Sequence, residues 1–502
     1  MNAPDAAAML HDLTRHGSPT DRSRLVDFQP LDPANRPAPF KRYADLETTP
    51  LPTELGEPAT PPAIDAVTLA RLLFFTGGVT RASSSRAFEE RTYFRTAMSA
   101  GNLHPVELYV VSTGVAGVPD GVHHFAPLEL GLTTLRTGAV TSGSACSLVF
   151  TGIPWRTAWK YGERGFRHLY WDAGTMLANL LAVADAHGLD ATVWTGFVDD
   201  DVARLVGVDG VSELPLALVS IGGRAPVDVS ADLPPLDLVV EPISPRPITF
   251  PLIVEAQQAG ALPNSGAVDD WRAHAIEGRR ARAEVEPPLD SVDGSIEHVI
   301  LQRGSTRIMR PDDASAALLE WGMAVGAGPV PADFVAPGTT LLEHNLAVHG
   351  IEGVEPGAYR WRDGDLELVR PGQFRPITQQ LCLDQPLGGD SAYTAFHSAR
   401  LDEVLGALGP RGYRVAQLEA GISSGRLSLA AFALGDGATG LTFFDDPVRR
   451  FFATEASCML VTSVGVPAYR NAAGGRPGSI TELNHYGDLM QRLSLQLHRG
   501  GR

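Results

Sequence analysis

One segment of this chain occurs twice. Residues 162–188 read GERGFRHLYWDAGTMLANLLAVADAHG, and residues 409–435 read GPRGYRVAQLEAGISSGRLSLAAFALG. The two align without a gap at an offset of 247, and ten of 27 positions are identical. Each copy is typical of a long, Ala-rich, buried helix that ends at glycine, and an aspartate-rich stretch follows each. The sequence therefore predicts one domain present twice, so differences between the copies indicate which one kept a function.

Length and charge limit the kinds of protein this chain can be. Its 502 residues exceed what one hydrophobic core usually supports, and 44% hydrophobic with 20% charged residues fits a globular protein. A net charge of -17 argues against a nucleic acid or an anionic membrane surface as partner. Neither a signal peptide nor an 18-residue apolar stretch is recognised. Three scattered cysteines without metal spacing predict reduced thiols, a cytoplasmic location and no metal site.

The order of predicted elements indicates an α+β fold in two domains. Residues 1–62 are predicted to be an extended arm, 63–228 the first domain, 229–290 a proline-punctuated linker, and 291–502 the second domain. Strand, turn, strand, long helix and strand recur in both domains, which is typical of helices on a mostly antiparallel sheet. The Ser/Arg-rich stretch before Val106 is predicted to be irregular. WRAHAIEGRRARAEVE, from Trp271, is predicted to be a surface helix.

Two familiar motifs are rejected on their context. GDGATG, from Gly435, matches a dinucleotide-binding pattern, but a helix precedes it and a strand follows, the reverse of the required order. GISSG, from Gly421, matches a hydrolase elbow but lies in the middle of a predicted helix. Neither motif is therefore assigned a function.

A first candidate cluster lies in RTYFRTAMSAGNLHPVELYVV, which begins at Arg91. Its Ser-Ala-Gly-Asn loop offers small residues and free backbone N–H groups, which let a flat ring approach closely. Ser99, Gly101 and Asn102, with Arg95 in the same cluster, are therefore candidate cofactor-binding residues. The alternative is an ordinary surface turn.

A second candidate cluster is QRGSTRIMRP, which begins at Gln302. Arg303 and Arg307 flank Ser305 at a predicted helix N-terminus. Two guanidinium groups and a hydroxyl in that position suit a phosphate. The alternative is a solvated basic patch in an acidic protein.

The first half resembles a known family in several blocks. RTAMSAGNLHPVELYVV, GVHHFAP, WRTAWKYGERGFRHLYWDAG and GFVDDDVARLVGVDG are similar to the SagB-type azoline dehydrogenases, a branch of the flavin-dependent nitroreductase superfamily. The resemblance covers residues 36–226 and, more weakly, the second copy. These enzymes oxidise thiazoline and oxazoline rings in ribosomally made peptides to thiazoles and oxazoles. The family usually has Pro-Ser-x-Gly where this chain has Met98-Ser99-Ala100-Gly101, which retains the backbone donors.

The resemblance implies FMN bound between two nitroreductase-like domains. In the family, one subunit holds the phosphate through Arg-x-Ser-x-Arg and a C-terminal basic residue, and its partner supplies the loop against the ring. This chain divides those parts between its copies. The second copy has Arg303, Ser305, Arg307 and Arg470, and the first has Ser99, Gly101 and Asn102. We therefore expect an internal pseudo-dimer with one FMN site and one decayed site, which could oligomerise further.

A Lys-Tyr pair supports the same division. The resemblance implies that Lys160-Tyr161 handles a proton during ring oxidation, with either residue as the base. The aligned residues of the second copy are Ala407-Leu408, which cannot transfer protons. Taken without the family, a Lys-Tyr pair is most often a surface feature.

The predicted function is that of a cytoplasmic, FMN-dependent azoline dehydrogenase acting on a peptide natural product. Its implied partners are an azoline-bearing precursor peptide and a cyclodehydratase complex, and oxygen is the electron acceptor by resemblance. One alternative is a general flavin reductase that uses a nicotinamide donor on quinones or nitro compounds. Another is a non-catalytic scaffold for the cyclodehydratase. The sequence leaves the choice between thiazoline and oxazoline open.

Overall fold

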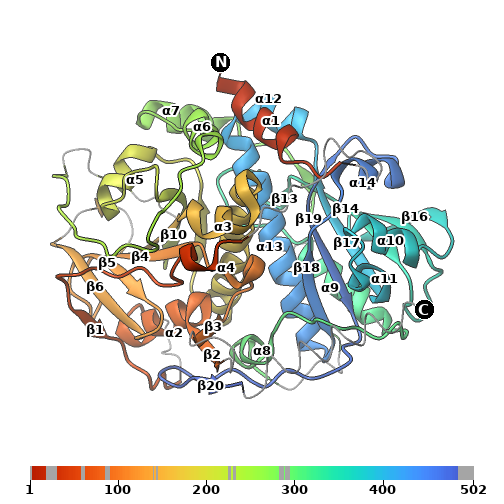
Figure 1. Cartoon of the computed structure of the whole chain (residues 1–502), viewed down its shortest axis with the longest axis horizontal. Helices are drawn as coiled ribbons and strands as arrows, with labels where there is room; N and C mark the ends of the chain where they lie inside the picture. The colour runs from red at the N-terminus through yellow and green to blue at the C-terminus, as the bar shows by residue number, and fades with distance from the viewer. Residues whose placement is uncertain are drawn as a thin grey trace.

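The computed structural model describes residues 3–17, 31–57, 63–84, 91–138, 141–142, 145–223, 228–229, 233–281, 288 and 294–483. Each half of the chain contains a large antiparallel sheet with helices packed on it (Figure 1). Two long helices, α4 (Gly165–Ala186) and α13 (Arg411–Ala433), pack against each other between the halves. The predicted α+β class is confirmed.

The two large sheets share one strand order. The first runs β1-β6-β5-β4-β8-β10-β9 and the second β16-β15-β14-β17-β19-β18, so they differ by the outer strand β1. The first sheet contains β1 (Thr48–Pro50), β4 (Val106–Ser112), β5 (Gly121–Ala126), β6 (Gly131–Thr137), β8 (Cys146–Gly152), β9 (Ala191–Trp194) and β10 (Leu214–Ile221). The second contains β14 (Leu342–Val348), β15 (Gly357–Arg362), β16 (Asp365–Pro371), β17 (Tyr393–Ala399), β18 (Gly437–Leu441) and β19 (Ser457–Gly465). The strands β4, β5 and β10 are buried along their whole length.

Most of the remaining helices begin at a capping residue or a proline. Asp65 accepts a hydrogen bond from the backbone N–H of Thr68 at 2.8 Å, and Ser295 and Ser315 cap two other helices. These helices are α1 (Ala3–Leu13), α2 (Ala66–Gly77), α3 (Pro154–Tyr161), α5 (Asp199–Val206), α6 (Pro251–Ala259), α7 (Ser265–Ala273), α8 (Ile296–Gln302), α9 (Ala316–Gly326), α10 (Arg375–Leu381), α11 (Pro386–Asp390), α12 (Leu401–Leu408) and α14 (Asp445–Phe452). Short 3-10 turns cover Pro33–Asn35, Ala100–Asn102 and Gly162–Arg164.

The central helices cross at a pair of glycines that are equivalent in the repeat. A Cβ atom on Gly174 would lie 2.7 Å from the Cα atom of Gly421, and one on Gly421 would lie 3.0 Å from the Cα atom of Gly174. Such distances are shorter than real Cβ contacts, so only glycine permits this approach. Both copies of the repeat therefore carry the glycine that the close crossing of α4 and α13 requires.

Two matched ion clusters join the halves. In each, an aspartate that opens a short helix of one half accepts hydrogen bonds from two arginines of the other half's central region. The pairs are Arg164 and Arg167 with Asp445 (3.3 and 2.8 Å), and Arg411 and Arg414 with Asp199 (2.7 and 3.0 Å). All six residues are buried. The four arginines are repeat positions 247 residues apart, so the contacts are reciprocal.

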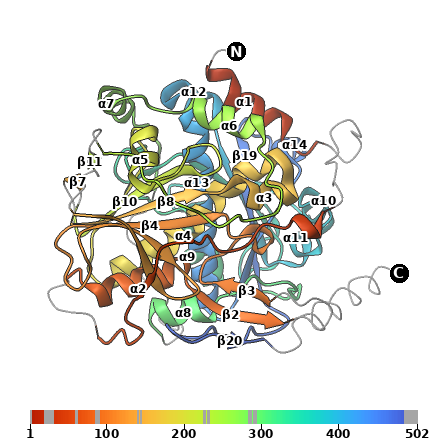
Figure 2. The ribbon, with the colours of Figure 1, turned by 60° about the vertical axis from the view of Figure 1, so that its left-hand side comes forward.

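The C-terminal segment returns to the first half. There β2 (Val79–Ser84) pairs with β3 (Arg91–Arg95) and, in parallel, with β20 (Thr481–Glu482) (Figure 2). The prediction that the Ser/Arg-rich stretch is irregular is therefore wrong for these two strands. The polar composition of this stretch gives no strand signal, and the partner strand β20 comes from the other end of the chain.

Two further predictions need correction. The arm is not simply extended, since it contains the helix α1, whose His11 ring lies 3.4 Å from the Tyr413 hydroxyl of α13. The predicted surface helix is also wrong, because α7 ends at Ala273 and Trp271 is buried. Residues 282–287 of that stretch lie outside the described residues.

Candidate functional site

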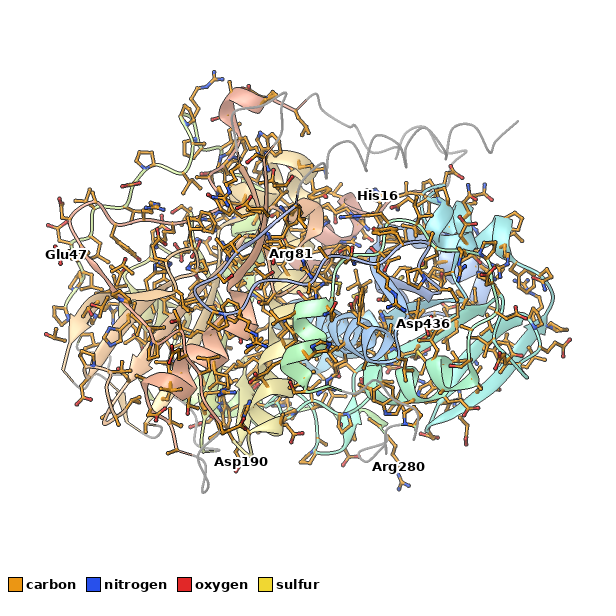
Figure 3. The ribbon with its side chains drawn as sticks, turned by 90° about the horizontal axis from the view of Figure 1, so that it is seen from below. His16, Glu47, Arg81, Asp190, Arg280 and Asp436 are labelled. Atoms are coloured by element: carbon orange, nitrogen blue, oxygen red, sulfur yellow. The ribbon has the colours of Figure 1, made fainter. Side chains whose placement is uncertain are left out.

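One pocket lies where the two halves and the C-terminal segment meet, and we call it the interface pocket. Its volume is about 300 Å³, at the lower end of the range for small-molecule sites. Seven of the ten predicted site residues line it: Arg95, Ser99, Asn102, Arg303, Ser305, Arg307 and Arg470. Arg81, also in its lining, lies near the middle of the molecule in Figure 3. The structure therefore brings together residues up to several hundred positions apart.

The ring loop, residues 98–102, forms one side of the interface pocket. Gly101 has a φ of 64° and Asn102 a φ of 58°, a left-handed turn that glycine and asparagine adopt most readily. The Asn102 amide donates to the carbonyl of Tyr93 at 2.8 Å, which fixes the loop to β3. The small residues and the turn predicted from sequence are thus held in one defined conformation.

A buried carboxylate holds this loop from beneath. Asp172, on α4, accepts hydrogen bonds from the Ser99 hydroxyl at 2.5 Å and from the Ala100 N–H at 3.0 Å. Burial raises the pKa of Asp172 to about 7, against the lowering effect of these hydrogen bonds and of Arg95. Asp172 therefore couples the conformation of the ring loop to the central helix.

Three arginines of the interface pocket are buried and anchor its walls. Arg303 donates twice to the carbonyl of Thr96, at 3.1 and 2.6 Å, and Arg81 donates to the carbonyls of Leu301 and Ala472. Arg95 donates to the carbonyl of Pro39 at 2.6 Å, and its Nε atom has no hydrogen-bond partner among the residues that the structure describes. Burial lowers the pKa of all three, to about 9 for Arg303 and about 10 for the others. These three arginines thus hold distant segments of the chain together, and their positive charges line the interface pocket.

The rim of the interface pocket is more open. Arg307 and Arg470 are exposed, and the N–H of Arg307 donates to the hydroxyl of Tyr469 at 3.0 Å. The prediction that this segment begins a helix is wrong, because α8 ends at Gln302 and residues 303–310 follow its C-terminal end. A helix dipole therefore does not favour an anion here, and any phosphate would depend on the guanidinium groups, Ser305 and backbone donors.

Lys160 and Tyr161 end α3 beside the ring loop. A Cβ atom on Gly101 would lie 2.7 Å from the Tyr161 hydroxyl and 3.3 Å from the Lys160 Nζ atom. The Tyr161 ring packs on His168, with centroids 4.1 Å apart. The three predicted residues that do not line the interface pocket therefore lie together at its edge, and the absence of a side chain at Gly101 gives them room.

The environment shifts the pKa values of Lys160 and Tyr161 in opposite directions. Burial lowers the pKa of Lys160, and the positive charges of Arg307 and Arg36 lower it further. Burial raises the pKa of Tyr161, and the charge of Asp172 adds to that rise. The lysine thus releases its proton more easily than in water, whereas the phenol keeps its own.

Comparison with known proteins agrees with this architecture. Residues 60–223 match the model of the Nitroreductase family. This part of the chain is a nitroreductase-family domain. A solved structure of a nitroreductase-like protein from Anabaena variabilis superimposes with a TM-score of 0.75 and 25% identity, over 92% of this chain and 99% of that one. Both halves together therefore recur in another protein.

Two curated relatives match between a quarter and a third of this chain. A Methanocaldococcus jannaschii protein named as a nitroreductase is 28% identical over 170 residues, which are 31% of this chain and 79% of the relative. The microcin B17-processing protein McbC of Escherichia coli is 28% identical over 142 residues, which are 25% of this chain and 52% of McbC. This chain thus spans about half the length of McbC.

The equivalent place in the second half is filled by apolar side chains. Trp271 of α7 packs with Phe334, Leu341 and Leu408, and its indole N–H donates to the carbonyl of Leu408 at 3.0 Å. Leu408 is the counterpart of Tyr161 in the repeat. Leu408 therefore lies in an apolar cluster, whereas its counterpart Tyr161 lies beside the ring loop of the nitroreductase-family domain.

Sequence reasoning missed two residues of the site. Arg81 lies in the stretch predicted to be irregular, and no local signal separated it from its neighbours. Asp172 had a signal, since the repeat places a carboxylate there in both copies. Arg224 stands near the end of the first copy, as Arg470 does in the second, and the sequence predicts that it matters less for FMN binding than Arg303 or Arg307; it lies outside the described residues. Among the described residues no group of metal-binding side chains is found, and no helix could cross a membrane.

Proposed function

We propose that this chain is an FMN-dependent dehydrogenase that oxidises thiazoline or oxazoline rings in a peptide to thiazoles or oxazoles. The observation that carries the proposal is the position of Lys160 and Tyr161 against Gly101, at the edge of a pocket lined by both halves. Nitroreductase-family members are flavin oxidoreductases, and the relative McbC is named for processing microcin B17.

We infer that the two halves form an internal pseudo-dimer. Support comes from their shared strand order, the crossing of Gly174 and Gly421, and the reciprocal ion clusters. In a two-fold interface, residue i contacts j while j contacts i, and these contacts follow that rule. The apolar cluster around Trp271 supports a single FMN site per chain.

The residues of the interface pocket suit FMN. Arg307, Arg470 and Ser305 would hold the phosphate, and the unpaired Nε atom of the buried Arg95 offers a further donor. The ring loop would approach the flavin ring through its backbone. When bound, FMN supplies a hydride acceptor.

Aromatising an azoline requires loss of a proton and a hydride from its ring. We assign Lys160 as the base, since its lowered pKa leaves more of it neutral near pH 7. Tyr161, whose pKa is raised, stays protonated and donates a hydrogen bond to the ring or its neighbouring amide. Gly101, which has no side chain, lets these two groups lie against the ring loop at the edge of the interface pocket, where the substrate ring would bind.

We further propose that the substrate is an azoline-bearing precursor peptide, that a cyclodehydratase complex is the partner, and that the protein is cytoplasmic. No disulfide links the buried side chains of Cys146, Cys382 and Cys458, which suits a reducing compartment. Purified protein loaded with FMN should convert a thiazoline peptide to the thiazole, with a mass loss equal to two hydrogen atoms per ring. Turnover of NAD(P)H with quinones, without loss of mass from the peptide, would favour the general flavin reductase. Absence of bound flavin would favour the scaffold.

A further inference from the structure

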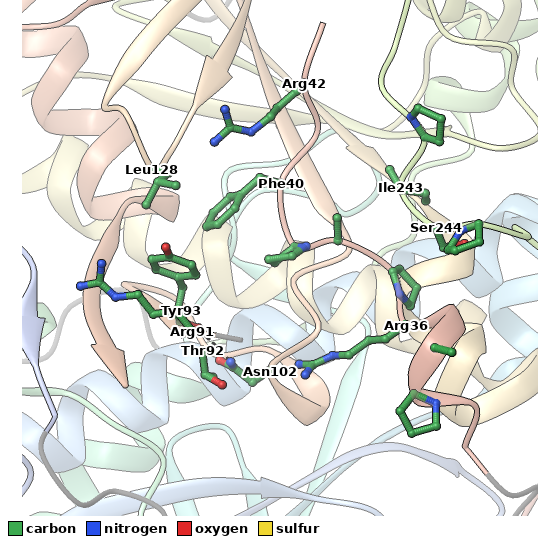
Figure 4. A pocket seen from close by; sticks show the side chains of 17 residues that line it. Arg36, Phe40, Arg42, Arg91, Thr92, Tyr93, Asn102, Leu128, Ile243 and Ser244 are labelled. Atoms are coloured by element: carbon green, nitrogen blue, oxygen red, sulfur yellow. Dashed lines mark hydrogen bonds between the residues drawn. The ribbon is translucent and has the colours of Figure 1, made fainter. Parts of the chain in front are cut away.

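A second and larger cavity adjoins the interface pocket, and we call it the proline groove. Its volume is about 910 Å³, near the upper limit for small-molecule sites. It lies between the N-terminal arm, β3 and the segment around Ile243 (Figure 4). Five prolines line it: Pro33, Pro37, Pro39, Pro242 and Pro245. Because proline restricts the backbone, the residues that line the groove lose little conformational entropy when a ligand binds there.

The proline groove is continuous with the proposed catalytic edge. Asn102 of the ring loop lines both cavities. Phe40 of the groove packs on Tyr93, with ring centroids 5.2 Å apart, and under the guanidinium of Arg95 at 5.3 Å. Arg36, whose side chain points toward Asn102 in Figure 4, is close enough to Lys160 to lower its pKa. Lys160 therefore lies beside the ring loop at the point where Asn102 joins the two cavities.

The charge of the proline groove differs from that of the whole protein. Among the described residues, its lining contains Arg36, Arg42 and Arg91 and no carboxylate, in a chain with a net charge of -17. Arg42 pairs with Glu129 at 2.7 Å, and Arg91 pairs with Glu482, all four side chains being at least 40% exposed. Exposed pairs of this kind contribute little, so a ligand carboxylate can replace Glu129 at small cost.

We propose that the proline groove binds an extended segment of the substrate peptide that carries acidic side chains next to the reacting ring. The inference rests on the proposed function. Apolar contacts with Phe40, Tyr93 and Ile243 accept side chains, proline carbonyls accept hydrogen bonds from the peptide N–H groups, and the arginines attract the carboxylates. A ring at the edge of the interface pocket would then be selected by its flanking sequence.

The test compares two peptides with one central thiazoline, flanked by Gly and Asp in the first and by Gly and Asn in the second. With holoenzyme, kcat/KM should favour the Asp peptide, and added salt should reduce the preference. Arg42→Glu should lower the Asp-to-Asn ratio about three- to tenfold, because it removes an exposed attraction and adds a repulsion. Arg42→Lys should keep most of the preference.

Arg362→Glu is the matched control, since Arg362 is an exposed arginine at 4.0 Å from Glu367 in the other half. An Asp-to-Asn ratio that Arg42→Glu leaves unchanged, or that Arg362→Glu lowers equally, would overturn the proposal. If wild type oxidises neither peptide, the proposed function fails, and the groove is then tested by fluorescence anisotropy with labelled, ring-free peptides. Equal binding of the Asp and Asn forms would overturn the groove, whereas tighter binding of the Asp form would support it.

Discussion

Asp172 and Glu419 occupy equivalent positions of α4 and α13, 247 residues apart, yet they hold different structures. Asp172 accepts hydrogen bonds from Ser99 and Ala100 of the ring loop. Glu419 accepts one from the N–H of Leu341 at 3.0 Å, directly before β14. The second copy therefore uses the same carboxylate position without a ring loop above it. The two halves diverged at the loop rather than at its support.

Both carboxylates should make stability depend on pH. Burial raises the pKa of each to about 7, so the fold binds their protons more tightly than the unfolded chain does. The stability that each carboxyl group contributes is fully present below about pH 4 and is lost as the pH rises to about 7, by roughly 2–4 kcal/mol per group. Asp172→Asn should flatten this part of the unfolding free energy measured against pH. Asp185→Asn, at an exposed position of the same helix, should leave the slope unchanged, and an unchanged slope in Asp172→Asn would contradict the assignment.

Loss of Arg307 should weaken FMN binding. A charge-assisted hydrogen bond contributes roughly 1.5–3 kcal/mol, so Arg307→Ala should raise the Kd about ten- to hundredfold in a fluorescence titration. Arg310→Ala is the control, because Arg310 is exposed, pairs with Asp312 and lies outside the lining of the interface pocket. Equal effects of the two changes would reject the phosphate assignment. Arg303→Ala should also weaken binding, partly because its bonds to Thr96 are lost.

Lys160→Ala and Tyr161→Phe should separate cofactor binding from chemistry. Neither side chain lines the interface pocket, so flavin absorbance should persist in both variants. Azoline oxidation should fall by about 10²–10⁴, the usual contribution of an acid–base group. Ala407 and Leu408 are the matched positions of the second half, and substitution there should leave turnover nearly intact. Full activity in the Lys160→Ala, Tyr161→Phe double variant would remove the azoline-dehydrogenase assignment.

Breaking either ion cluster between the halves should destabilise the whole fold. Asp445→Asn leaves two buried arginines without their carboxylate, which typically costs about 3–5 kcal/mol. Asp199→Asn should cost a similar amount, because it makes the equivalent contacts. The control is Asp446→Asn, whose partner Arg15 lies at 2.9 Å near the surface. A small loss in a urea titration for either cluster variant would argue against a reciprocal interface.

Much of the fold could be predicted from the sequence, because the pattern of apolar residues extends along whole helices and strands. The central helices and the interior strands carry continuous apolar patterns, and the repeat fixed their equivalence. β2 and β3 were not predictable, since their sequence is polar and β20 arrives from the far end of the chain. The segment after Gln302 was misassigned because Ser295, upstream, is the true cap of α8.

The site was predictable where motifs are local. The ring loop, the arginines around Ser305 and the Lys-Tyr pair each stand in one short stretch, and the structure places all three around the interface pocket. Arg81 depends on contacts with Leu301 and Ala472 that span more than two hundred residues. Contacts between residues so far apart cannot be predicted from the local sequence around Arg81.

An anaerobic titration with a thiazoline peptide tests the central claim most directly. Without an acceptor, each chain loaded with FMN should oxidise one ring, and the flavin absorbance should bleach in step with the loss of two hydrogen atoms from the peptide. Two rings oxidised per chain would contradict the single composite site. A flavin that NADPH bleaches but the thiazoline peptide does not would contradict azoline dehydrogenation itself.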